Sequence, residues 1–178
     1  MTFNSSMLDV CVSADAVPAD LTDFEQVCGL HSDGVPFSHS SSRGTMASQH
    51  LDELLEAFRA SELHYLRQPV STIRGPAVAR AVGALERLFE QIRREPSRAL
   101  ACTVRECSEQ QLVDAASGPE VVPVPNIVND DEDGESLPYV IVYLKAHMVV
   151  LRHAVAHQLC VVHGQSHRLD GSEVRYGT

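Results

Sequence analysis

The stretch RGPAVARAVGALERLFEQIRREP, residues 74–96, is the part of the sequence that predicts a structure most clearly. Pro76 suits the first turn of a helix because its ring fixes φ and its missing amide has no partner there anyway. Apolar residues then recur at helical spacing as far as Pro96, which cannot continue a helix. They are Val78, Val82, Leu85, Leu88, Phe89 and Ile92. The stretch therefore predicts an amphipathic helix over residues 76–96.

A second helix is predicted upstream of this stretch. Ser48 can accept a hydrogen bond from the first free amides, and leucines at 51, 54 and 55 follow at helical spacing. Pro69 disfavours a helical residue before it and lacks an amide donor. These residues predict a helix over 48–67.

Shorter elements are predicted downstream. Ser108 can cap a short helix over 108–116, which the sequence Ser117-Gly118-Pro119 would end. Two prolines in residues 120–125 predict an extended or edge strand, since proline cannot donate to a sheet. Five acids in residues 129–136 predict a solvated loop.

The most apolar part of the chain is residues 137–163. Residues 138–144 are rich in β-branched and aromatic side chains, which predicts a buried strand followed by a helix at about 146–162; one long helix is the alternative. Lys145, Arg152 and three histidines interrupt the run. The apolar stretches between them are shorter than the roughly 20 residues that a bilayer requires, so we expect no membrane span.

The N-terminal quarter of the chain has a different composition. Residues 1–46 contain six acids against a single base and end in the serine-rich tract 38–42. Such a segment buries little apolar surface, which predicts a mobile, disordered acidic tail in which a short strand or helical turn could dock locally. The predicted organisation is this tail at 1–46, a compact α-rich domain at 47–170 with a small β element, and a short tail at 171–178.

Composition limits the classes of partner and compartment. The formal net charge of −10 argues against nucleic acid as the main partner, because phosphate binding requires clustered Lys and Arg. Five cysteines form an odd set without framework spacing, which indicates a reducing compartment rather than a disulfide scaffold. The N-terminal sequence has no basic start with an apolar block, so we expect a cytoplasmic protein.

One set of residues suggests a metal site. On the helix predicted at 146–162, His153, His157 and Cys160 would share a face, and Cys102 with Cys107 could complete a tetrahedral zinc site. The alternative is that these are ordinary core or surface residues. No nucleophile elbow, phosphate-binding glycine pattern or HExxH motif occurs in the sequence. We therefore predict no cofactor, and keep a small zinc-binding protein or hydrolase as an alternative.

A group of arginines suggests a binding site instead. Arg93, Arg94, Arg98 and Arg105 form a local basic patch on an acidic protein. A guanidinium group suits the capture of a carboxylate or an acidic peptide. The alternative for Arg105 is a surface side chain that covers apolar neighbours.

Residues 85–112 resemble the PUB domain, the small helical module of peptide N-glycanase and some UBX adaptors. In that family a helix ends in Asn-Ile-hydrophobic-x-x-Pro, and about six residues later Ser-Ile-Arg precedes a short helix. Here Gln91 to Pro96 is followed, after six residues, by Thr103-Val104-Arg105. Gln91 stands where the family has Asn, and Ser108 stands where it has a second Asn. The resemblance implies a pocket formed by Gln91, Arg105 and Ser108 that binds the C-terminal tail of the AAA ATPase valosin-containing protein.

These observations together predict a mostly α (α+β) protein that is not an enzyme. Its predicted function is protein–protein interaction, either as an adaptor with a PUB-like peptide site or as a structural subunit of a larger complex.

Overall fold

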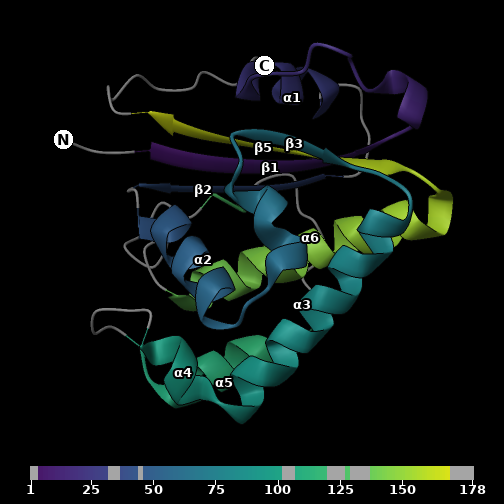
Figure 1. The fold of residues 1–178 in the computed structure, drawn as a ribbon. Coiled ribbons are helices and arrows are strands. Elements are labelled where there is room, and N and C mark those ends of the chain that lie inside the picture. The colour runs from purple at the N-terminus through teal and green to yellow at the C-terminus, as the bar shows by residue number, and fades with distance from the viewer. Residues whose placement is uncertain are drawn as a thin grey trace.

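The protein has an α+β fold in which helices predominate over strands (Figure 1). The computed structural model describes residues 4–31, 37–43, 46–101, 107–119, 127–128 and 137–168. In chain order the elements are β1 (Asn4–Val12), η1 (Ala14–Ala16), α1 (Phe24–His31), β2 (Phe37–Arg43), α2 (Met46–Ala57), η2 (Ser61–Arg67), β3 (Val70–Ile73), α3 (Pro76–Arg94), α4 (Pro96–Leu100), α5 (Glu109–Ser117), β4 (Ile127–Val128), α6 (Leu137–His157) and β5 (Cys160–Arg168).

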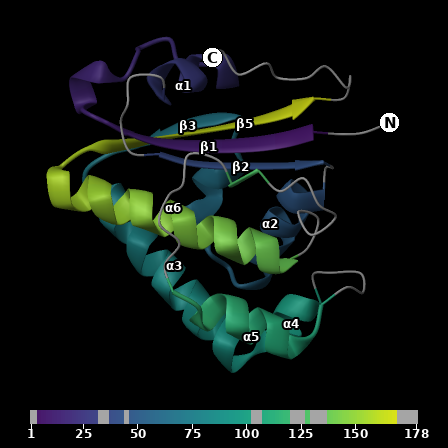
Figure 2. The same ribbon diagram turned by 180° about the vertical axis from the view of Figure 1, so that it is seen from behind.

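The strands form a five-stranded sheet in the order β3-β5-β1-β2-β4. β1 is the central strand and pairs antiparallel with both β2 and β5, while β4 pairs parallel with β2. Helix α1 covers one face of the sheet, and α6 crosses the other face with α2 beside it and α3 farther from the sheet (Figures 1 and 2). The N-terminal and C-terminal parts of the chain therefore meet in the middle of the sheet.

Successive side chains of β1 point to opposite faces of the sheet, so the core has two parts. Leu8, Val10 and Val12 pack under α1 with residues of β5, whereas Met7 and Cys11 belong to the larger core on the α6 side. Both faces of β1 are covered, and every residue from Met7 to Val12 is buried. A strand covered on both faces has no polar side, which explains the nearly continuous apolar sequence of Met7–Val12.

The prediction of a mobile tail over 1–46 is wrong for the part of it that the structure describes. β1 is the centre of the sheet, and α1 supplies Phe24, Val27 and Leu30 to the smaller core. Composition averaged over 46 residues concealed the short apolar run of β1. The sheet joins residues 4 and 168, so the domain boundary predicted at 47 does not exist.

The helix predicted at 76–96 is confirmed, with α3 ending at Arg94. The helix predicted at 48–67 is divided: α2 ends at Ala57, Arg59 adopts a positive φ of 53°, and η2 follows as a 3-10 helix. No proline or glycine marks this break. The turn lets Leu63 and Leu66 of η2 reach the core, where both are fully buried.

The strand predicted at 138–144 is wrong, because these residues belong to the single helix α6. The helix predicted to reach residue 162 ends at His157, and β5 begins at Cys160. Burial on nearly all sides gives α6 no polar stripe, so its helical period cannot be seen in the sequence. Tertiary packing here overrides the β preference of the β-branched side chains.

Helix α6 is long and apolar enough to cross a membrane by length and composition alone, the only such helix among the described residues. In the fold, 67% of its most apolar window is buried inside the protein. This burial agrees with the expectation that residues 137–163 do not form a membrane span. The segments 120–126 and 129–136, predicted as extended and as an acidic loop, lie outside the described residues, as does 171–178.

Candidate functional site

The candidate site is a group of buried polar side chains between the sheet and α6. Asp9 of β1 and His163 of β5 stand directly opposite each other in the antiparallel register. Both side chains therefore leave the same face of the sheet. Their sequence separation is 154 residues, so only the pairing of the first and last strands brings them together.

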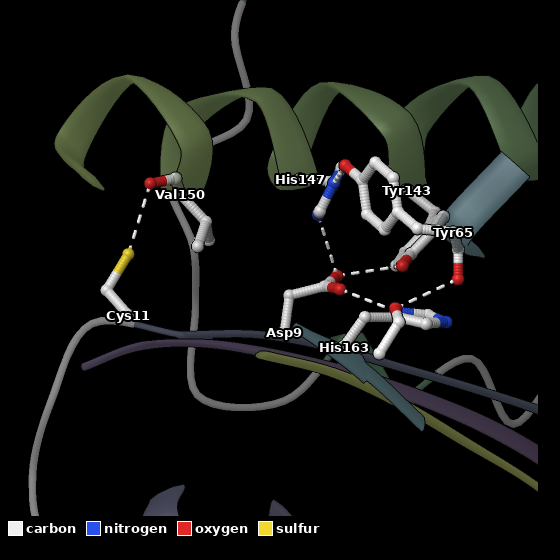
Figure 3. A network of polar contacts seen from close by, with 8 residues as sticks. Asp9, Cys11, Tyr65, Tyr143, His147, Val150 and His163 are labelled. Atoms are coloured by element: carbon white, nitrogen blue, oxygen red, sulfur yellow. Dashed lines mark hydrogen bonds and ion pairs between the residues drawn. The ribbon is translucent and has the colours of Figure 1, made fainter. Parts of the chain in front are cut away.

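Helix α6 supplies Tyr143 and His147, which are four residues apart and therefore share the face that meets the sheet. Tyr65 reaches the same group from η2 (Figure 3). The backbone carbonyl of Tyr65 accepts a hydrogen bond from the Ser71 hydroxyl at 3.0 Å, which ties η2 to β3. We call Asp9, Tyr65, Tyr143, His147 and His163 the buried polar network.

The carboxylate of Asp9 is the centre of this network. His163 Nδ1 lies 2.7 Å from Asp9 Oδ1, and the Tyr143 hydroxyl donates to Asp9 Oδ2 at 2.7 Å. His147 Nδ1 lies 3.1 Å from Oδ2, within ion-pair distance. On its far side, His147 Nε2 is hydrogen-bonded to the Tyr65 hydroxyl. Three groups from two other elements thus surround one carboxylate.

The environment keeps Asp9 ionised. Burial acts to raise the pKa of the carboxyl group, but the charges and hydrogen bonds of His147 and His163 outweigh it and hold the pKa well below its usual range. An ionised carboxylate can only accept hydrogen bonds, so His163 Nδ1, which is hydrogen-bonded to Asp9, is the donor in that bond. Burial, and then the Asp9 charge, raises the pKa of Tyr65 and of Tyr143 well above that of free tyrosine.

The order hydroxyl, imidazole, carboxylate in Tyr65, His147 and Asp9 is the order found in acid–base relays. A relay acts on substrate only if one member reaches it. The side chains of Asp9, His147 and His163 are 0% exposed, whereas Tyr65 is partly exposed. The carboxylate and the imidazoles therefore join α6 to the sheet within the core, and Tyr65 is the partly exposed member of the series.

Two further buried polar groups lie close to the carboxylate of Asp9. His163 Nε2 is buried and has no hydrogen-bond partner among the described residues. The Cys11 thiol donates to the carbonyl of Val150 at 3.1 Å. Burial, followed by the charge of Asp9, raises the pKa of Cys11 to about 12, which keeps it a thiol and not a nucleophile.

The C-terminal end of α5 is held by cations from two other helices. Lys145 of α6 donates from Nζ to the carbonyl of Gly118, and Arg93 of α3 donates to the carbonyl of Ala116 at 3.0 Å. Cations are favourable at this end of a helix. Burial, and then the Arg93 charge, lowers the pKa of Lys145. This buried amine joins α5 to α6.

Two of the three predicted peptide-binding residues lie in the described part of the chain. Gln91 is exposed near the end of α3. Ser108 is the N-cap of α5, as predicted, and its hydroxyl accepts from the amide of Gln111 while the Gln111 side chain accepts from the amide of Ser108. Arg105 lies outside the described residues. Capping therefore already engages Ser108, and the structure does not describe a pocket with all three residues.

The arginines predicted to form a basic patch are mostly paired with acids. Arg93 and Arg94 both contact Glu90, at 2.6 Å and 2.7 Å, and Arg98 lies 3.5 Å from Glu95. Glu90 and Glu95 thus offset two of the three positive charges of the described arginines.

The predicted metal site is not formed. His153 and His157 share a face of α6, but Cys160 lies beyond the helix, on β5, and is buried under α1. Cys102 is outside the described residues, and Cys107 is half-buried. Within the described ranges, no group of three or more His, Cys, Asp or Glu side chains could hold a metal ion.

Sequence reasoning missed the buried polar network, although two signals for it exist. Asp9 is the single charged residue in the apolar run Met7–Val12, and a charge within such a run is typical of a buried, partnered group. Tyr143 and His147 have the spacing of helical neighbours. The strand predicted at 138–144 hid that second signal.

The chain matches no protein-family model, and no curated protein or solved structure matches it.

Proposed function

We propose that this protein is a non-catalytic protein–protein interaction module, either an adaptor or an accessory subunit of a larger complex. One observation carries the proposal: the side chains best suited to acid–base chemistry, Asp9, His147 and His163, are completely buried and bind one another. Such groups stabilise a scaffold, and a scaffold acts through its surface.

The peptide site proposed for this module lies after α3, around Gln91, Arg105 and Ser108. The order of elements supports it: α3 ends at Arg94, Pro96 begins the five-residue helix α4, and α5 begins after the Ser108 cap. Apart from α4, this is the order of helix, proline stop and short helix on which the resemblance to the PUB domain rests. The partner proposed on that basis is the C-terminal peptide of an AAA ATPase.

The compartment proposed for this function is the cytoplasm. Cys11, Cys28, Cys107 and Cys160 are all free thiols, which is what a reducing compartment favours.

The test is affinity capture from the native cell with three forms of the full chain: wild type, Arg105→Glu and Arg80→Glu. Arg80 is exposed on α3 and has no proposed role, so it is a matched control for the reversal of charge. We expect wild type and Arg80→Glu to recover an AAA ATPase. Arg105→Glu should recover at least about tenfold less of it, because the carboxylate of the bound peptide would lose its cationic partner.

The other outcomes are equally informative. Recovery of a fixed set of subunits that is insensitive to Arg105→Glu would support the accessory-subunit form and contradict the PUB-like site. If no protein co-purifies in stoichiometric amount with wild type, the interaction function itself is wrong.

A further inference from the structure

The C-terminal end of α6 carries a pair of histidines that the buried polar network does not use. His153 and His157 are four residues apart, and their ring centroids are 4.3 Å apart with the planes inclined by 37°. His157 is exposed and His153 is partly exposed. Two imidazoles therefore meet at the surface of one helical turn.

The last turn of α6 is held in a fixed conformation. Gln158 adopts a positive φ of 57°, and the amides of Gln158 and Leu159 donate back to the carbonyls of Val155 and Ala154, at 3.4 Å and 2.9 Å. These two bonds form a Schellman motif, which ends the helix without fraying. Ala154 itself is buried in the core. The histidine pair thus stands on a rigid support, which lowers the entropic cost of binding a ligand between the rings.

The local charge also favours a cation. The end of a helix carries partial negative charge from its free carbonyl groups. The neighbouring cation, Arg152, is paired with Glu86 at 3.0 Å, so its positive charge is partly compensated. A dication between the two imidazoles would therefore meet little repulsion from its neighbour.

We propose that His153 and His157 form a two-ligand chelate site for a divalent transition-metal ion such as Zn²⁺, Ni²⁺ or Cu²⁺. Neutral imidazole is a good ligand for these ions, and two rings on one rigid turn bind as a chelate, with water in the remaining positions. Cys160 takes no part, because it is buried under α1. The site is independent of the peptide-binding function proposed above.

The test is calorimetric titration of the untagged full chain with Zn²⁺ at about pH 7.5, where imidazole is mostly neutral. The variants are His153→Gln, His157→Gln and, as the matched control, His64→Gln, which changes an exposed histidine of η2. We expect one ion per chain for wild type and His64→Gln, and affinities at least about tenfold weaker for each of the other two variants, since one ligand lost removes the chelate effect. Circular dichroism checks that all variants keep their helix content.

Two further measurements test the same site. Zn²⁺ should raise the thermal midpoint of wild type and of His64→Gln but not of either chelate variant, because an ion that binds only the folded state stabilises it. Binding should also weaken at about pH 5.5, where protons compete for imidazole. Absence of binding to wild type, binding that survives both chelate substitutions, or dependence on only one of the two histidines would overturn the proposal.

Discussion

At the scale of single residues, Asp9 holds the most demanding position in the protein. A buried carboxylate is costly unless several donors compensate its lost hydration. Here His147, His163 and Tyr143 supply those contacts from β5 and α6. The same carboxylate therefore fixes how α6 lies on the sheet, because a rotation of the helix would separate it from two of its partners.

Replacement of Asp9 by Asn should lower the free energy of unfolding by about 3 kcal/mol. The amide of Asn has a single acceptor oxygen, and its NH₂ group would face donors, so buried N–H and O–H groups would lose partners. Urea denaturation measures the change. Asp20→Asn, at an exposed position, is the control and should leave the midpoint unchanged. A similar midpoint for both variants would show that the network contributes no stability.

At the scale of elements, the contact of α1 with the sheet depends on Gly164. A Cβ atom built at this position on β5 would lie 2.9 Å from a methyl carbon of Val27, closer than real Cβ atoms approach. The missing side chain thus lets α1 pack close to β5. Gly29 within α1 has open space around it instead.

Gly164→Ala should therefore destabilise the protein by about 1–3 kcal/mol through overpacking against α1. In the double variant Gly164→Ala with Val27→Ala, the smaller side chain makes room, so the loss should be smaller than the sum of the two single losses. Gly29→Ala is the matched control and should be neutral or slightly stabilising, because alanine favours helix. Thermal and urea unfolding are measured for wild type, the two single variants, the double variant and the control. Additive effects of Gly164→Ala and Val27→Ala would mean that the added methyl group does not clash with Val27.

The cap of α5 allows a second prediction at this scale. Ser108→Ala removes the hydroxyl that accepts from the Gln111 amide at 3.2 Å, and should cost about 1 kcal/mol. Ser108→Asp keeps an acceptor in the same place and should retain the stability of wild type. If Ser108→Ala weakens peptide capture while stability is unchanged, the residue acts in binding rather than as a cap.

For the molecule as a whole, sequence reasoning succeeded where local pattern decides the structure. The helical period of residues 76–94 and the capping sequence at Ser108 are local, and both were predicted. β1 and the N-terminal part of α6 were not, because each is buried on most sides and lacks the polar face by which a period is recognised. The candidate site needs strands from opposite ends of the chain to pair, and no local pattern contains the Asp9–His163 register.

Because Asp9 lies in this pairing, the free energy of unfolding of the whole protein should depend on pH. Burial alone would raise the pKa of the native Asp9 carboxyl group. Contacts with His147 and His163 nevertheless hold this pKa well below its usual value near 4. The unfolded chain therefore binds a proton at a pH where the native protein does not. The stabilisation is complete above about pH 5 and decreases as pH falls below about 4, by up to about 1.4 kcal/mol per pH unit.

The measurement compares the urea stability of wild type and Asp9→Asn between about pH 5 and pH 3, where Asn cannot titrate. The difference between the two proteins should shrink as pH falls through this range, since only wild type loses the contribution of the ionised carboxylate. The ¹³C shift of the Asp9 carboxyl carbon checks the same point in native wild type and should keep its ionised value below about pH 4. A carboxyl group that titrates at its usual value, with a constant stability difference, would mean that the two histidines do not hold Asp9 in its charged form.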